Sequence, residues 1–290
     1  MKLVVTGSSG MLGRALCLKL AQRHQVIGLD ILKPEAQGSK LEGFIECDIT
    51  DRKKSIEYIG ASRADLVIHA AAYTDVDGCE KNEQQALAVN AYGAQNIALG
   101  CKHCGCSLIY ISTDFVFDGE KHKPYLVSDR PNPINIYGKS KWFGEKFIQE
   151  ALVNCLIVRS SWLFGKGGKN FVTTLMEKAK ERTRLEVVND QFGCPTYVKD
   201  LALGISRLIA FSNTSGIYHI TNSVSCSWYE LAQKIKRLRG LPVEIVPVSS
   251  AQYQGTKRPR MSVLDNRRYQ QALGSALRPW PEALEEYLLS

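Results

Sequence analysis

The sequence predicts an α/β fold: a doubly wound parallel sheet with a smaller C-terminal lobe. Two observations support this prediction. Short apolar runs alternate with helix-like stretches through the first half of the 290 residues, and a glycine-rich loop follows the first run. Alternating strands and helices build a parallel sheet, because right-handed crossovers place each helix on a face of that sheet. With 44% hydrophobic residues, the chain has enough apolar side chains for a full core.

Six apolar runs are the predicted strands, and helix-like stretches of ten or more residues separate most of them. These runs are 3–5, 26–29, 43–46, 66–69, 107–111 and 155–158. In doubly wound sheets, ligands bind beyond the carboxyl ends of the strands. The residues that follow each run are therefore the candidate site.

The glycine loop after the first run predicts a dinucleotide site. Gly7, Gly10 and Gly13 are spaced Gly-x-x-Gly-x-x-Gly, one spacing away from the usual Gly-x-Gly-x-x-Gly fingerprint. Glycines there permit a tight turn and let backbone N–H groups approach a pyrophosphate at a helix N-terminus. Asp30 ends the second run about 20 residues later, where a carboxylate accepts hydrogen bonds from the adenosine ribose. The pattern is typical of a Rossmann-type fold.

The residues around Asp30 leave the choice of cofactor open. Its carboxylate would repel a 2′-phosphate and so favours NADH. Arg14 and Lys33 lie near it in the sequence and could offset that repulsion. We therefore expect NADPH or NADH.

Tyr137 and Lys141 are four positions apart, which places them on one face of a helix. A lysine charge there can stabilise the phenolate and pull the tyrosine pKa from about 10 toward the working pH. Such a tyrosine can exchange a proton at a carbonyl. The alternative is a half-buried tyrosine beside a solvated lysine, because this spacing is common.

From about residue 161 the regular alternation of apolar runs and helix-like stretches ends. Prolines are frequent there, and helices and short strands alternate less regularly. We expect a dinucleotide-binding domain over 1–160 and a substrate-binding lobe over 161–290. Part of 195–212 is expected to return to the first domain. We find no internal repeat.

The composition limits which binding partners and which cellular compartment we expect. The net charge of +8 comes from basic residues spread along the chain, so we expect no nucleic acid partner. No stretch is apolar and long enough to span a bilayer, and the first strand begins at Lys2 without a signal peptide, so we expect a cytoplasmic protein without a membrane partner. Cys101, Cys104 and Cys106 look like metal ligands, but no second pair follows at zinc-finger spacing. We expect free thiols and no metal.

Further motifs resemble one family across the whole length of the chain. The motifs are Ser112-Thr113-Asp114-Phe115-Val116-Phe117-Asp118-Gly119, Asn135-Ile136-Tyr137-Gly138, Arg159-Ser160-Ser161-Trp162, 189–196 and 258–264. In this order they are similar to the dTDP-4-dehydrorhamnose reductase family of the extended short-chain dehydrogenase/reductase superfamily. The resemblance implies reduction of the C4 ketone of a dTDP-4-dehydro-6-deoxyhexose, with dTDP-L-rhamnose as the default product.

The resemblance also assigns roles to residues. Tyr137 would protonate the C4 oxygen, Lys141 would hold the nicotinamide ribose and lower the tyrosine pKa, and Thr113 would hydrogen-bond the same oxygen. Asp114, Trp162 and Arg258 would contact the substrate. The cofactor would contact Gly7, Gly10, Met11, Leu12, Gly13, Asp30, Asp48, Ile49, Ala71, Ala72, Tyr73, Tyr137 and Lys141. Two plainer interpretations stay open: Trp162 as a core residue, and Asp48 as the cap of the next helix.

Phe115 helps to distinguish a reductase from a sugar-nucleotide 4,6-dehydratase. Sugar-nucleotide 4,6-dehydratases resemble the chain but carry a glutamate at this place to handle a proton at C5. Phenylalanine cannot do so, which favours reduction without elimination. The family most often has tyrosine here. A nucleotide-sugar epimerase and a non-catalytic protein similar to the regulatory subunit of methionine adenosyltransferase stay open as alternatives, and so does a homodimer.

Overall fold

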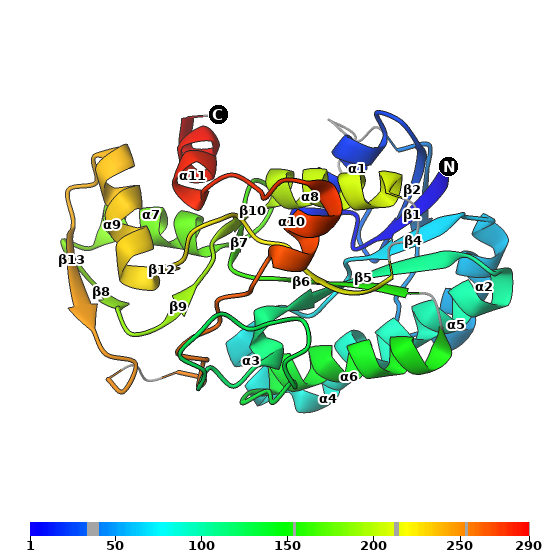
Figure 1. The fold of residues 1–290 in the computed structure, drawn as a ribbon, viewed down its shortest axis with the longest axis horizontal. Coiled ribbons are helices and arrows are strands. Elements are labelled where there is room, and N and C mark those ends of the chain that lie inside the picture. The colour runs from blue at the N-terminus through cyan, green and yellow to red at the C-terminus, as the bar shows by residue number, and fades with distance from the viewer. Residues whose placement is uncertain (34–40, 153–154, 212–214, 253–254, 290) are drawn as a thin grey trace.

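The computed structural model describes residues 1–33, 41–152, 155–211, 215–252 and 255–289. Its centre is a seven-stranded parallel sheet in the order β11-β6-β5-β4-β1-β2-β3 (Figure 1). The strands are β1 (Lys2–Thr6), β2 (Gln25–Asp30), β3 (Gly43–Glu46), β4 (Leu66–His69), β5 (Ser107–Thr113), β6 (Cys155–Ser160) and β11 (Gly216–His219). All six predicted runs are strands of this sheet, and the prediction of a doubly wound parallel sheet is confirmed.

Helices cover both faces of the sheet because side chains alternate along each strand. Leu3 and Val5 point into the core beneath α1 (Met11–Leu20) and α8 (Val198–Ala210). Val4, between them, points into a second core on the opposite face. The helices α2 (Arg52–Ser62), α5 (Ala94–Cys104) and α6 (Ile136–Ala151) pack there (Figure 1).

Shorter helices connect these layers near the carboxyl ends of the strands. They are α3 (Val76–Lys81), α4 (Glu83–Leu87), the π-helix η1 (Ala88–Gly93) and the 3₁₀ turn η2 (Asp114–Val116). The π-helix leads directly into α5, and η2 directly follows β5. Both irregular elements therefore begin or end close to the edge where a ligand would bind.

The smaller lobe, at the left of Figure 1, is built from three two-stranded sheets and the helices α7, α9 and α11. β13 pairs with β8 in parallel, and α9 packs on both strands. The elements are β7 (Leu163–Phe164), α7 (Phe171–Glu181), β8 (Arg184–Val188), β9 (Phe192–Gly193), β10 (Thr196–Tyr197), β12 (Cys226–Ser227), α9 (Trp228–Arg239), β13 (Glu244–Val248) and α11 (Trp280–Leu289). The helix α10 (Arg267–Leu273) packs instead on β11 of the central sheet.

One segment from the second half of the chain lies with the central sheet. α8 packs against α1, and β11 pairs in parallel with β6 so that Ile217 faces Ile157. The sequence analysis did not predict β11. The division into 1–160 and 161–290 stays a prediction. No helix in the described ranges combines the length and apolar character needed to cross a bilayer.

Candidate active site

A cavity of about 800 Å³ opens at the carboxyl ends of β1, β2, β4 and β5, where the doubly wound sheet predicts it. Most of the predicted site residues line it. They are Gly7, Gly10, Met11, Leu12, Gly13, Asp30, Asp48, Ile49, Ala71, Ala72, Thr113, Tyr137, Lys141, Trp162 and Arg258. Tyr73 and Asp114 lie outside the cavity wall: the backbone of Tyr73 is held by Asn90, and Asp114 is 2% exposed.

The glycine loop forms a tight turn against β4. Gly7 has a φ of +67°, and a Cβ there would lie 2.6 Å from the backbone nitrogen of Ala71, so a larger residue would force the two segments apart. Gly10 precedes α1 and places no capping side chain over its first turn. Met11 and Leu12 of this first turn line the cavity, and the first N–H groups of a helix have no acceptor within the helix itself. This arrangement fits a dinucleotide pyrophosphate, with its negative charge at the positive end of the helix.

Asp30 and Asp48 hold the loops that follow β2 and β3. Asp30 accepts hydrogen bonds from the backbone N–H groups of Ser9 (2.9 Å) and Leu32 (3.2 Å). Asp48 accepts from the backbone N–H and the hydroxyl of Thr50, both at 2.8 Å. The interpretation of Asp48 as a helix cap is wrong, because Asp51 caps α2 by accepting from the N–H of Lys54.

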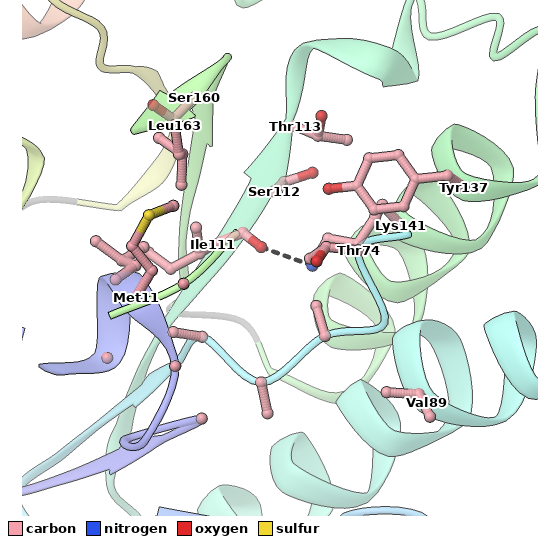
Figure 2. A pocket seen from close by; sticks show the side chains of 18 of the residues that line it. Met11, Thr74, Val89, Ile111, Ser112, Thr113, Tyr137, Lys141, Ser160 and Leu163 are labelled. Atoms are coloured by element: carbon pink, nitrogen blue, oxygen red, sulfur yellow. Dashed lines mark hydrogen bonds between the residues drawn. The ribbon is translucent and has the colours of Figure 1, made fainter. Parts of the chain in front are cut away.

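Tyr137 lies in the first turn of α6 and points its hydroxyl into the cavity beside Ser112 and Thr113 (Figure 2). Asn135 caps this helix by accepting a hydrogen bond from the N–H of Gly138 at 2.8 Å. Burial raises the pKa of Tyr137 above its usual value, while a hydrogen bond with Thr113 lowers it by less. The phenol is therefore protonated at neutral pH.

Lys141 lies one turn further along α6 and is 3% exposed. Its Nζ donates to the carbonyl oxygen of Ile111 at 2.7 Å (Figure 2) and lies 4.1 Å from the ring centre of Tyr110. Burial lowers the pKa of Lys141 to about 7, although Glu145 acts in the opposite direction. The pKa of Tyr137 is raised overall because burial outweighs the hydrogen bond with Thr113, and the lowering by Lys141 stays a prediction.

Thr113 ends β5 and is held in a local network. Its Oγ1 donates to Asp114 Oδ1 at 3.0 Å and accepts from the N–H of Phe115 at 3.2 Å. Burial raises the pKa of Asp114 to about 7. Phe115 lines the cavity and packs edge-on against Tyr137, with 5.8 Å between ring centres. The cavity wall thus carries an aromatic ring where an acid at position 115 would stand.

Trp162 stacks on Trp228, with ring centres 3.4 Å apart and an angle of 5° between the planes. Both rings line the cavity. Trp162 adopts a positive φ of 47°, which is unusual for a residue with a side chain and indicates local backbone strain. Trp162 is half-buried and its side chain lines the cavity, so it is not confined to the hydrophobic core.

Arg258 comes from a loop of the smaller lobe and reaches the same cavity. Its Nη2 lies 3.7 Å from Asp77 on α3, which also accepts the N–H of Thr256 at 3.3 Å. Asn135 donates from its Nδ2 to the carbonyl oxygen of Lys257 at 3.0 Å. The loop that carries Arg258 is therefore tied to the helix that carries Tyr137.

Sequence reasoning missed two residues of this arrangement. Asn135 is not among the predicted site residues, although asparagine before a helix is a recognisable cap signal. Trp228 had no signal in the sequence, because its contact with Trp162 joins segments far apart along the chain. A single sequence does not reveal such pairings.

Comparison with known proteins shows the family. The family model described as RmlD substrate binding domain matches residues 1–290. The chain is 41% identical over 289 residues to the spore coat polysaccharide biosynthesis protein SpsK of Bacillus subtilis (strain 168), covering 99% of this chain and 96% of the relative. It is 36% identical over 299 residues to a dTDP-4-dehydrorhamnose reductase of Aggregatibacter actinomycetemcomitans, covering 98% and 97%.

A solved structure agrees with these relatives. The crystal structure of dTDP-4-dehydrorhamnose reductase from Bacillus anthracis str. Ames, in complex with NADP, has a TM-score of 0.90 and 38% sequence identity to this chain. The similarity covers 99% of this chain and 98% of that one. The chain therefore belongs to the RmlD substrate binding domain family, the family of dTDP-4-dehydrorhamnose reductases in the extended short-chain dehydrogenase/reductase superfamily.

Proposed function

We propose that this chain is an NADPH- or NADH-dependent reductase that converts the C4 ketone of a dTDP-4-dehydro-6-deoxyhexose into the alcohol, with dTDP-L-rhamnose as the default product. One observation supports this most strongly. Tyr137, Lys141 and Thr113 share a single cavity with the uncapped N-terminus of α1. A proton donor and a dinucleotide cradle at one site suit the reduction of a ketone.

The cofactor would lie along the loops at the ends of β1, β2 and β4. The first turn of α1 would bind the pyrophosphate, and Asp30 would bind the adenosine ribose. Lys141 would hold the nicotinamide ribose. The Bacillus anthracis relative was solved with NADP, which favours NADPH among the two cofactors. When bound, the nicotinamide supplies the hydride for C4.

Tyr137 would donate its proton to the C4 oxygen as negative charge develops there. Burial keeps the phenol protonated at neutral pH, so the acid is in the correct state before the substrate reacts. The hydroxyl of Thr113 would hydrogen-bond the same oxygen and orient it. In the structure this hydroxyl donates its single proton to Asp114 Oδ1, so it would turn that proton to the C4 oxygen when the substrate binds.

The remaining cavity residues would select the substrate. Arg258 offers a guanidinium from the smaller lobe for the diphosphate, in keeping with the usual pairing of arginine and phosphate. Trp162 and Trp228 offer flat apolar surfaces at the same wall. Phe115 supplies no acid or base, which favours net reduction over elimination.

The test is turnover of NADPH with a dTDP-4-dehydro-6-deoxyhexose, followed by NMR identification of the product. We expect Tyr137→Phe to bind NADPH with unchanged affinity and to lose roughly 10²- to 10⁴-fold in turnover, the usual contribution of a positioned acid. Tyr92→Phe is the matched control. It also removes a tyrosine hydroxyl, but Tyr92 lies on η1 and is 54% exposed. Near-full activity of Tyr137→Phe would show that another group is the acid.

Two alternative functions and two further expectations have tests of their own. Absence of turnover together with tight binding to a synthetase would favour the regulatory-subunit alternative, and interconversion of sugar epimers without net consumption of NADPH would favour an epimerase. A homodimer and a cytoplasmic location are expectations from the sequence that solution mass measurement and fractionation would check.

A further inference from the structure

Three cysteines lie together where α5 ends and β5 begins. Gly105 follows α5 with a φ of +72°, and its N–H and that of Cys106 both donate to the carbonyl oxygen of Cys101. This left-handed turn brings the two residues beside Gly105 together. The Sγ atoms of Cys104 and Cys106 are 3.3 Å apart. This is within the range of direct sulfur contact.

We propose that Cys104 and Cys106 form a redox-active dithiol, which small-molecule disulfides oxidise reversibly to an intramolecular disulfide. The two sulfurs need to approach by only a little more than 1 Å, since the S–S bond is about 2.05 Å long. Cys104 is partly exposed and offers the point of entry, whereas Cys106 is 8% exposed and lies behind it.

The neighbouring thiols favour the second step of the exchange. Hydrogen bonds from Cys101 and Cys104 lower the pKa of Cys106 to about 7, against the effect of burial. Burial raises the pKa of Cys104, so the first step of the exchange is expected to be the slower one, and it also raises the pKa of Cys17 and Cys226. A thiolate is the nucleophile in disulfide exchange, so Cys106 is suited to attack.

The exchange balances in two steps. Cys104 first attacks the oxidant and forms a mixed disulfide, and one half of the oxidant leaves as a thiolate. Cys106 then attacks the Cys104 sulfur, forms the intramolecular bond and releases the second half. Two cysteine thiols are oxidised, one small-molecule disulfide is reduced, and the two cysteine protons end on the two released thiols.

The dithiol is separate from the proposed active site. Cys106 precedes the first residue of β5, whereas Thr113 at the other end of that strand lines the cavity. No group of three or more His, Cys, Asp or Glu in the described residues is arranged to hold a metal ion. The 3.3 Å contact between the two sulfurs is the observation that favours a reversible disulfide.

The test uses the folded chain in oxidised glutathione, followed by acid quenching, alkylation and mass spectrometry. Trypsin cleaves after Lys102 and Lys121, and the peptide 103–121 contains Cys104 and Cys106 but not Cys101. We expect a mass shift: the oxidised peptide should carry no alkyl group and weigh about 2 Da less than its unalkylated dithiol form, through loss of two hydrogens. Excess reduced thiol before the quench should restore a peptide with two alkylated cysteines. Cys104→Ser and Cys106→Ser should each abolish the shift, and Cys101→Ser should keep it.

Three results would overturn the proposal. One is a cross-link between the peptide 103–121 and the peptide that carries Cys101, since Cys101 would then be the partner. Another is a glutathione adduct that persists on Cys104. The third is an unchanged peptide. As a second measurement, phenylarsine oxide bridges closely spaced thiols and should label this peptide in the wild type but not in Cys104→Ser.

Discussion

Lys141 and Arg159 are both buried cations close to the cavity, but their surroundings differ. Arg159 is 1% exposed and makes two hydrogen bonds to the carboxylate of Glu145, at 2.9 and 2.6 Å. Lys141 is 3% exposed and donates to a backbone carbonyl, that of Ile111. Each also lies over an aromatic ring.

The difference indicates which cation is structural and which is available for chemistry. A buried guanidinium with a bidentate carboxylate is neutralised as a unit and links β6 to α6. The ammonium of Lys141 donates to a neutral carbonyl, which does not neutralise its charge. Because burial removes its hydration, the charged form is disfavoured and the pKa of Lys141 is lowered. Lys141 therefore remains free to bind a polar group at the cavity wall, while Arg159 does not.

The largest effect is expected at the carboxylate. Glu145→Gln leaves the charge of Arg159 without compensation in the interior, so we expect the free energy of unfolding to fall by about 3–5 kcal/mol. Urea unfolding measures it. Glu285→Gln is the control, because it removes a carboxylate from a half-exposed pair with Lys234 and should cost less than about 1 kcal/mol. A loss equal to the control would contradict the structural role of the Glu145–Arg159 pair.

The second largest effect is expected in the pH dependence of the free energy of unfolding, to which Lys141 contributes. Its pKa is about 7 in the folded chain and about 10.4 when unfolded, so the unfolded chain binds one more proton between these values. Stability should therefore rise with pH in this window by up to about 1.4 kcal/mol per pH unit, and Lys141→Met should lack this rise.

Urea unfolding at several pH values from 7 to about 9.5 checks this contribution as the difference between wild type and variant. Lys139→Met is the control, since Lys139 is 45% exposed and pairs with Glu83 at the surface. Equal slopes for wild type and Lys141→Met would mean that the buried lysine keeps its proton, and the contrast with Arg159 would disappear.

The smallest effect concerns the alignment of α6, which carries both Lys141 and Glu145. Asn135→Asp keeps the acceptor for Gly138 but loses the donor to the carbonyl of Lys257. We expect KM for the dTDP-sugar to rise roughly 3- to 10-fold, the value of one hydrogen bond, with KM for NADPH unchanged. Asn82→Asp, at the exposed cap of α4, should change neither constant. A similar rise in both KM values would contradict a specific link to the Arg258 loop.

The sequence predicted the strands and the loops because these depend on local patterns. The runs at 66–69 and 155–158 are buried throughout, as continuous apolar sequences in a parallel sheet should be. β11 was missed because its four residues include a glycine, a tyrosine and a histidine, so it has no long apolar run. Its position beside β6 depends on a crossover that no local pattern reveals.

The chemistry of the site was predicted in part. Spacing placed Tyr137 and Lys141 on one helix face, and the glycines marked the cradle. The electrostatics were not predictable, because burial shifts both pKa values and depends on which segments fold over α6. The network from Asn135 to Lys257 joins residues more than a hundred positions apart. The geometry supports the roles of the residues in the cavity, which the proposed experiments test.

The stacked pair of Trp162 and Trp228 gives the protein an optical probe of its own. Two stacked indoles with ring centres 3.4 Å apart are close enough for their electronic transitions to couple. Both rings belong to the cavity wall, so a sugar nucleotide that touches one of them perturbs the coupling. Occupancy of the substrate side can thus be followed by spectroscopy without a label, independently of cofactor absorbance.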